Sequence, residues 1–223
     1  MWSSLLELLL PTRCAGCDLP GELLCEECRS ALPLIEAQWA CPRCGAPFGH
    51  LVCTECWRAE PAFEQGVCVG SLAPPLSRCI SLYKDAGERR LGALLGDMLG
   101  AAVGTWQEWP QAVVPVPPSA SALRIRGFDH TAAIACRVAG SLGVPLLHAL
   151  AAAGAKDQRA LGRTERRINV EGAFVPTHGE RLPPRILLVD DVMTTGATLD
   201  AAAAALLAAG AEVVRIGAVA RAW

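Results

Sequence analysis

The chain has 223 residues, of which 52% are hydrophobic and 19% are charged, and its formal net charge is −2. This composition excludes a disordered chain, and the nearly neutral charge excludes an overall field that would attract nucleic acid or an anionic membrane. No run reaches the ~18 consecutive apolar residues of a membrane span, so we expect no transmembrane helix.

The first eleven residues, MWSSLLELLLP, are apolar but include Glu7 and lack the basic region of a secretory signal. Leu5, Leu8 and Leu9 share one helical face, so we expect a short amphipathic helix that docks on the rest of the protein. CxxC pairs in a chain without an export signal are typical of a reducing compartment, and we expect a cytoplasmic protein.

Eight of the eleven cysteines form four CxxC pairs before residue 57: Cys14/Cys17, Cys25/Cys28, Cys41/Cys44 and Cys53/Cys56. Thiolates at this spacing are typical of structural Zn²⁺ sites, and eight suffice for two tetrahedral Cys₄ sites. Sequential pairing, interleaved pairing and a single occupied site all stay open, and Cys₄ geometry also suits iron. Because about 60 residues bury little core, we expect bound metal to supply the folding free energy of this segment.

The composition changes near residue 60, where the cysteine pairs give way to alternating apolar and helical patterns. We therefore predict a zinc-ribbon domain over residues 1–60 and an α/β domain over residues 61–223. The three remaining cysteines, Cys68, Cys79 and Cys136, have apolar neighbours and are predicted to be small core residues.

The alternating pattern of residues 61–223 predicts a mostly parallel sheet flanked by helices. Strands are expected at Gly66–Leu72, Ala112–Val116, Arg185–Asp190 and Glu212–Ala220. Helices are expected at Arg89–Val103, Asp129–Leu142 and Ala197–Ala209, the last two ended by glycines. The basic stretch Ala149–Gly172 has few apolar residues, and we expect an exposed loop or a loosely attached helix.

The stretch ILLVDDVMTTGATL, residues 186–199, carries the main candidate site. Its first four residues are continuously apolar, as in a strand buried on both faces, so Asp190 and Asp191 are predicted to emerge at the carboxyl edge of the sheet. Carboxylates there can accept hydrogen bonds from sugar hydroxyls, while the turn into the next helix presents N–H groups and the helix dipole to a phosphate. The predicted site comprises Asp190, Asp191, Val192, Met193, Thr194, Thr195, Gly196, Ala197 and Thr198.

The strand, the Asp-Asp pair and the TTGAT loop resemble the signature with which phosphoribosyltransferases bind phosphoribosyl pyrophosphate. The resemblance implies a type I phosphoribosyltransferase-like fold, a ligand accompanied by Mg²⁺, and displacement of pyrophosphate through an oxocarbenium-like transition state. Cationic donors would neutralise the departing pyrophosphate. Lys84, in SLYKDAGERR, and Arg126, in RIRGFDHT, are the candidates; the alternative for each is an ordinary surface charge.

A zinc-ribbon segment followed by such a domain is similar to the ComF family. The similarity continues in VVPVPPS (113–119), RGFDHT (126–131) and QRALGRTERRINVEGAF (158–174). Asp129-His130 departs from the Asn-Gln pair usual in that family. The resemblance implies a part in natural transformation, with handling of single-stranded DNA in the cytoplasm and a helicase-like partner.

Residues 124–167 include eight basic residues and three acidic residues. The candidates among them for contacts with nucleic acid or with pyrophosphate are Arg159, Arg163, Arg166 and Arg167. Both ligands need the same charges, and Phe128 is the one aromatic residue offered for base stacking. The sequence thus predicts a ComF-like protein that binds phosphoribosyl pyrophosphate and Mg²⁺. The alternative is an active phosphoribosyltransferase of nucleotide metabolism with an unknown acceptor and no DNA role.

Overall fold

The computed structural model describes residues 11–47, 49–153, 173–177 and 182–223. Its centre is a four-stranded sheet with the order β1-β6-β5-β2, in which every ladder is parallel. The strands are β1 (Gly66–Ser71), β6 (Val213–Arg221), β5 (Arg185–Met193) and β2 (Ala112–Pro115). The predicted parallel sheet is confirmed, and each strand lies within three residues of its expected bounds.

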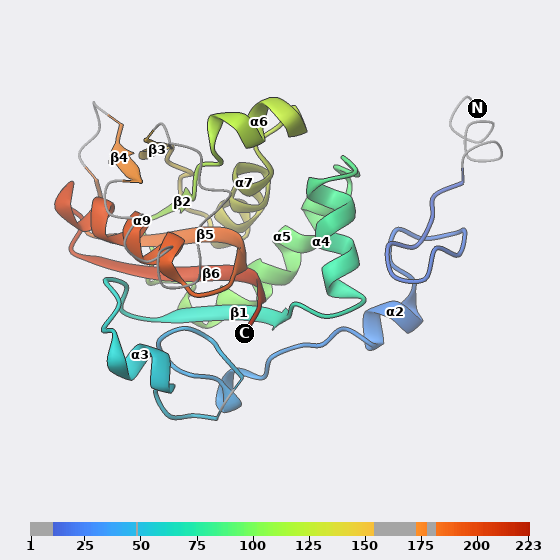
Figure 1. Ribbon diagram of the computed structural model, residues 1–223, viewed down its shortest axis with the longest axis horizontal. Coiled ribbons are helices and arrows are strands. Elements are labelled where there is room, and N and C mark those ends of the chain that lie inside the picture. The colour runs from blue at the N-terminus through green and yellow to red at the C-terminus, as the bar shows by residue number, and fades with distance from the viewer. Residues whose placement is uncertain (1–10, 48, 154–172, 178–181) are drawn as a thin grey trace.

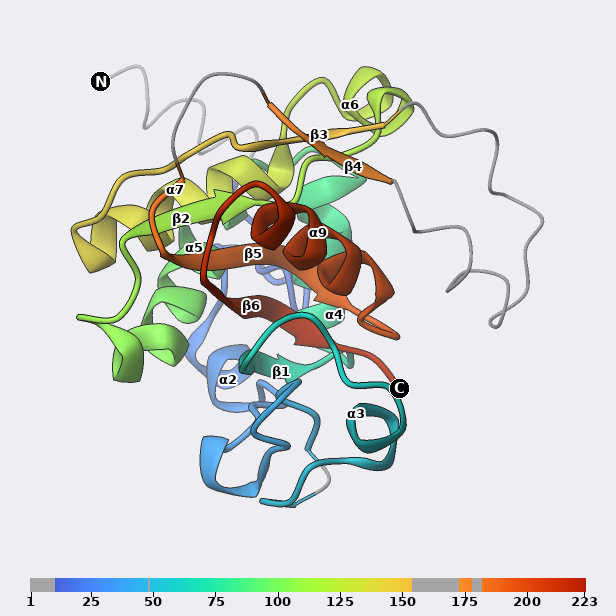
Figure 2. The same cartoon turned by 90° about the vertical axis from the view of Figure 1, so that its left-hand side faces the viewer.

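Helices cover both faces of the sheet, as Figures 1 and 2 show. The helices of one face are α4 (Leu76–Lys84), α5 (Leu91–Ala102) and α7 (His130–Leu142), and α9 (Ala197–Ala208) covers the other. Along β5, Ile186 and Leu188 pack in the core on the α9 side, whereas Leu187 and Val189 pack in the core beneath α5 and α7. This two-sided burial explains why the strand is continuously apolar.

The remaining elements are short: α2 (Glu26–Ser30), α3 (Thr54–Arg58), α6 (Ala120–Arg126), the antiparallel pair β3 (Leu150–Ala152) and β4 (Phe174–Pro176), and 3₁₀ turns at Ala37–Trp39 and Val103–Trp106. The expectation of an exposed segment from Ala149 is wrong at its start, because Ala149 and Leu150 are buried in the core on the α9 side. Among the described helices, none is long and apolar enough to cross a membrane.

Chain segments outside the sheet cover both of its edge strands. Beside β1, the amide of Ile35 donates to the carbonyl of Val69 at 2.9 Å, and the amide of Ser71 donates to the carbonyl of Pro33 at 2.8 Å. Beside β2, the amide of Leu147 donates to the carbonyl of Val113 at 2.9 Å. The first of these covering segments connects the two cysteine-rich stretches, which lie at opposite ends of β1 (Figure 1).

The three cysteines outside the CxxC pairs behave differently from one another. Cys68 and Cys79 are buried in the core, as predicted, and burial raises the pKa of the Cys68 thiol to about 12. The prediction for Cys136 is wrong, because this residue is exposed. It occupies the outer side of α7, whose inner side buries Ile134 and Val138.

Candidate functional site

The acid pair lies within β5 rather than beyond its end. The expected strand end at Asp190 is wrong by three residues, because β6 continues alongside and the amide of Ala222 donates to the carbonyl of Met193 at 2.9 Å. Asp190 and Asp191 are only 8% and 6% exposed. Their position is still the carboxyl end of a parallel sheet, the edge at which such sheets bind ligands.

Asp191 is held by two partners from the helices of one face. Its Oδ2 lies 3.2 Å from Lys84 Nζ, at the end of α4, and 3.4 Å from His130 Nε2, at the start of α7. Among the described residues no cation forms an ion pair with Asp190, and its Oδ1 accepts a hydrogen bond from the Asp191 amide at 2.8 Å. The fold therefore brings together three residues that are 46 and 61 positions apart in the sequence.

The two carboxyls respond to this environment in opposite directions. Burial, followed by the charge of Asp191, raises the pKa of Asp190 well above its ordinary value of 3.8. Burial also opposes ionisation of Asp191, but the hydrogen bond from His130 and the charge of Lys84 outweigh it and lower the pKa of Asp191. One acid is thus held ionised beside a cation, while the other favours the neutral form.

Arg126 joins the same group through His130. Its guanidinium lies 3.3 Å from His130 Nε2 and 3.7 Å from Asp85 Oδ1. The carbonyl of His130 accepts a hydrogen bond from the Tyr83 hydroxyl at 2.7 Å, and both residues are buried. The structure therefore brings both predicted cations, Lys84 and Arg126, to the side of the sheet that carries Asp191.

Sequence reasoning gave no role to His130. Its only signal was the Asp129-His130 departure from the family pattern. In the structure, Asp129 caps α7 by accepting the amide of Ala132 at 2.8 Å, which fixes the first turn of the helix. His130 follows directly and meets Asp191.

The threonine loop, residues Thr194–Thr198, connects β5 to α9. Gly196 is the N-cap of α9 with φ of 81°, a conformation that favours glycine, and a Cβ there would lie 2.6 Å from Met193 Cε. The side chains of Thr194 and Thr198 are exposed. The loop therefore offers threonine hydroxyls and the first amides of a twelve-residue helix to an anion.

A cavity of about 870 Å³ opens on the α9 side of this loop. Its walls are α9 and the segment Thr54–Phe63, which includes α3, and Phe174 also lines it. Thr195, Gly196 and Ala197 form part of its lining, whereas Lys84, His130 and Asp191 do not. The threonine loop thus lies between the acid pair on one side and the cysteine-rich segment on the other.

The CxxC cysteines gather in two groups along the chain. The first cysteine cluster is Cys14, Cys17, Cys25 and Cys28, and the second cysteine cluster is Cys41, Cys44, Cys53 and Cys56. Within each cluster the four sulfur atoms lie within 4.8 Å of one another. The CxxC pairs are therefore combined sequentially along the chain, and they form two four-cysteine sites rather than one.

The sulfur spacing suits a tetrahedral zinc site. The contacts Cys14–Cys25 and Cys44–Cys53 measure 3.5 and 3.7 Å, close to the ~3.8 Å between thiolates bonded to zinc at ~2.3 Å. The backbone amides of Cys25 and Cys53 donate to Cys14 Sγ and Cys41 Sγ, each at 3.3 Å. Such donors stabilise thiolates, the form that binds metal.

Two of these thiols have lowered pKa values. Burial opposes ionisation of Cys14, but backbone hydrogen bonds outweigh it and lower its pKa to about 6. A hydrogen bond from Cys56 does most to lower the pKa of Cys44 to about 5, with burial opposing it and the charge of Arg221 contributing. The shifts differ within each cluster, because burial does most to raise the pKa of Cys28, and the hydrogen bond with Cys44 does most to raise that of Cys56.

Several sequence expectations lie outside the described residues. They are the amphipathic helix in residues 1–10 and the basic candidates Arg159, Arg163, Arg166 and Arg167. The boundary near residue 60 stays a prediction.

Comparison with known families agrees with both parts of the architecture. The model of the double zinc ribbon domain matches residues 5–57, and that of the phosphoribosyl transferase domain matches residues 173–222. The second match contains the acid pair, the threonine loop and α9. The chain thus combines a double zinc ribbon with a phosphoribosyltransferase-like α/β fold.

Curated relatives match over most of the chain. Competence protein ComFC of Bacillus subtilis is 30% identical, covering 86% of this chain and 80% of its own length. Competence protein F of Haemophilus influenzae is 29% identical over 89% and 90% of the two chains, and DNA utilization protein YhgH of Salmonella typhi is 29% identical over 94% and 96%. The chain belongs to the ComF family.

Among solved structures, the chain resembles a purine phosphoribosyltransferase from Pyrococcus horikoshii at 20% identity, with a TM-score of 0.38. The similarity covers 57% of this chain and 83% of that one.

Proposed function

We propose that this protein binds phosphoribosyl pyrophosphate together with Mg²⁺ at the acid pair and the threonine loop. The observation that carries the proposal is the order of groups at the end of β5. Two buried carboxyls precede a loop that enters α9 through a left-handed glycine, all within the span matched by the phosphoribosyl transferase domain. Carboxylates suit ribose hydroxyls, and helix-start amides suit the 5′-phosphate.

The cations beside Asp191 fit the charge of such a ligand. Lys84 and Arg126 carry positive charge next to the acid pair, where a pyrophosphate group needs neutralising. Bound Mg²⁺ would neutralise part of the same charge. Lys84 then has two tasks, to hold Asp191 ionised in the free protein and to meet the phosphates of the ligand.

Calorimetry with phosphoribosyl pyrophosphate and Mg²⁺ tests the proposal. We expect saturable heat with the wild-type protein, and no measurable heat after Asp190→Asn and Asp191→Asn are introduced together. The exposed Glu108→Gln serves as the control and should bind as the wild type does. Circular dichroism checks that each variant is folded. Absence of heat from folded, zinc-loaded wild-type protein, at ligand far above micromolar, refutes the proposal.

We further propose that this binding protein works in DNA uptake, the role suggested by the names of its relatives, competence proteins and DNA utilization proteins. We expect a single-stranded oligonucleotide to bind more weakly as salt rises, because phosphate contacts release counterions. Replacing Arg163, Arg166 and Arg167 with glutamine should remove most of that dependence. Binding that ignores both salt and these arginines contradicts the DNA role.

The alternative is turnover without a DNA role. The two functions are distinguished by measuring the release of pyrophosphate from phosphoribosyl pyrophosphate in the presence of a purine or pyrimidine base. Turnover that is unaffected by DNA, in a protein that binds no oligonucleotide, favours an enzyme of nucleotide metabolism.

A further inference from the structure

Arg221, the last residue of β6, is a charged side chain buried in the core. It is 2% exposed and is among the largest fully buried side chains of the described residues. A buried guanidinium is unfavourable unless several acceptors surround it. Its contacts therefore indicate what the residue does.

One set of contacts is with backbone carbonyls at the start of the threonine loop and just after β6. Arg221 Nη1 donates to the carbonyl of Met193 at 3.3 Å and also to the carbonyls of Thr194 and Ala222. Because a trans peptide is planar, the amide that follows each carbonyl points the opposite way. By holding the carbonyls of Met193 and Thr194, Arg221 sets the direction of the Thr194 and Thr195 amides.

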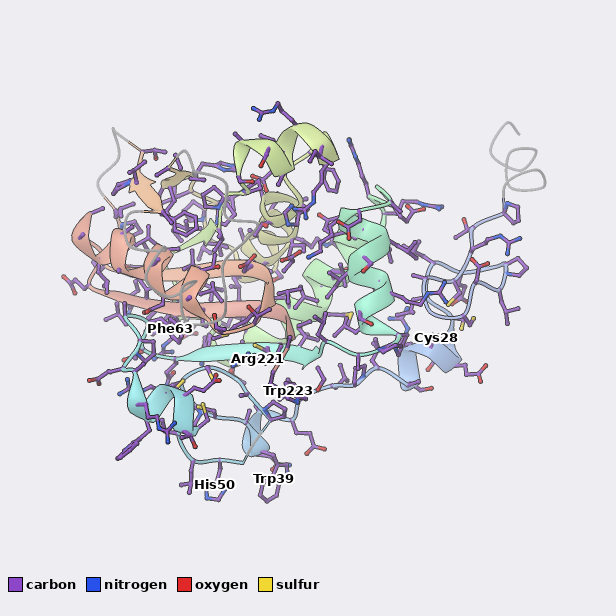
Figure 3. The ribbon with its side chains drawn as sticks, in the orientation of Figure 1. Cys28, Trp39, His50, Phe63, Arg221 and Trp223 are labelled. Atoms are coloured by element: carbon purple, nitrogen blue, oxygen red, sulfur yellow. The ribbon has the colours of Figure 1, made fainter. Side chains whose placement is uncertain are left out.

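The other side of Arg221 faces the second cysteine cluster. Its Nη2 lies 3.4 Å from Glu55 Oε2, and Glu55 belongs to α3, between the ligands Cys53 and Cys56. A zinc ion with four thiolates leaves about two net negative charges, which a nearby guanidinium offsets. Figure 3 shows Arg221 between the sheet and the sulfur atoms next to α3.

The Nε of Arg221 gives a second, independent sign of this relation. Of the buried side-chain nitrogen and oxygen atoms in the part of the chain that the structure describes, it is the one without a hydrogen-bond partner. An unpaired buried donor is costly. The negative field of metal-bound thiolates nearby would lower that cost, so the conformation of Arg221 is best stabilised when the second cluster holds metal.

A second contact attaches the start of α9 to the same region. Asp200, in the first turn of α9, accepts a hydrogen bond from the Ala62 amide at 2.7 Å. Ala62 follows α3 and lines the cavity together with Asp200. The segment Thr54–Phe63 is therefore connected to the threonine loop through Arg221 and to the start of α9 through Asp200.

We propose that Arg221 is a positioning residue that couples metal binding at the second cysteine cluster to the conformation of the threonine loop. Metal at the cluster and an anionic ligand at the loop then stabilise each other. The ligand part of this inference rests on the proposed function. Coupling between two sites is reciprocal, so each partner must strengthen the binding of the other by the same factor.

The test compares Arg221→Gln with the matched control Arg215→Gln. Arg215 lies on the same strand and also has an acidic partner, Glu64 at 2.8 Å. Its guanidinium stacks on Trp106 and Trp109, whereas that of Arg221 donates hydrogen bonds to the loop. Two measurements need no ligand: hydrogen exchange of the amides of residues 193–198, and the rate at which a coloured chelator removes the second zinc. A third is the affinity for phosphoribosyl pyrophosphate with Mg²⁺.

In Arg221→Gln we expect faster exchange in the loop and zinc release that is roughly tenfold faster, the usual range for groups that support metal ligands. In the wild type, phosphoribosyl pyrophosphate should slow zinc release, and Arg221→Gln should lose this protection. Arg215→Gln should match the wild type throughout. Unchanged exchange and zinc release in folded Arg221→Gln overturn the inference.

Glu55→Gln keeps the test decisive if Arg221→Gln does not fold. Glu55 is 65% exposed, so its replacement does not disturb the core, yet it removes the ion pair on the metal side. Faster loop exchange in this variant supports the coupling, and unchanged exchange opposes it. If wild-type protein binds no phosphoribosyl pyrophosphate, the proposed function fails, whereas the exchange and zinc measurements still decide the coupling.

Discussion

The two cysteine clusters share ligands and spacing but differ in what surrounds them. In the first cluster only Cys14 is buried and Cys17 is exposed, whereas three of the four cysteines of the second cluster are buried. Figure 3 shows Cys28 of the first cluster, a residue of α2, far from Arg221, which faces the second cluster. The ligands of the first cluster thus lie mostly nearer the surface, whereas those of the second lie mostly in the interior.

The attachments of the clusters differ in the side of the sheet that they reach. The first cluster contacts α4, where Arg78 Nη1 donates to the carbonyl of Gly16 at 2.6 Å, and Cys14 packs in the core beneath α4 and α5. The second cluster packs in the core on the α9 side with Leu188 and Ile216. Loss of metal at the first cluster should therefore act mainly on the α4 side, and loss at the second should reach α9 and the threonine loop.

The largest expected effect is that of Cys44→Ser. Structural zinc contributes ~10–16 kcal/mol in zinc peptides, which is comparable with the ~5–15 kcal/mol stability of a whole domain. Because Cys44 is 1% exposed and lies in the core on the α9 side, we expect this variant to lose one zinc ion and its cooperative unfolding transition. Zinc analysis and thermal circular dichroism measure both. A cooperative transition close to that of the wild type would show that folding does not depend on the second cluster.

A smaller effect is expected for Cys17→Ser. This variant should also lose one zinc ion, but it should keep a cooperative transition at a lower temperature, because Cys17 is exposed whereas Cys44 is buried. In the wild type, a chelator should correspondingly remove two zinc ions in two phases, and Cys17→Ser should lack the faster one. A single phase for both ions would remove the distinction between the clusters.

The smallest effect concerns the acid pair, which lies apart from both clusters. The folded-state pKa of Asp190 is raised above 3.8. The contribution of the neutral Asp190 to the free energy of unfolding is therefore complete below that pH, and it is lost as the pH rises through the folded-state pKa. Asp190→Asn stays neutral and should be more stable than the wild type at pH 8, with the difference shrinking towards pH 4. Urea unfolding at both pH values measures this, and a constant difference contradicts it.

Much of the fold could be predicted because burial on two faces leaves a plain pattern. The continuous apolar run before Asp190 located β5, and the spacing of Ile134 and Val138 located α7. The end of β5 could not be predicted, since two acids resemble a strand end unless the continuation of β6 is known. The pair β3 and β4 is only three residues long in each strand and carries no periodic signal.

The candidate site was predictable where its residues are contiguous and not where the fold assembles them. The threonine loop follows the acid pair directly, so one stretch of sequence suggested both. His130 and Arg221 act through neighbours 61 and 28 positions away. The departure at Asp129-His130 was the one sequence signal for the first, and no local pattern marks Arg221. An arginine after an apolar strand reads as a surface charge until the strand is seen to end inside the protein.

The backbone contact between Pro33–Ile35 and β1 has a consequence for the protein in metal-poor cells. An uncovered edge strand offers a row of unpaired amides and carbonyls to another chain. Here the covering segment is held at each end by a cysteine cluster, so the two metal ions indirectly keep that edge closed. Without zinc, β1 would then become an uncovered edge strand. The metal-free protein would self-associate through β1 in addition to losing ligand binding.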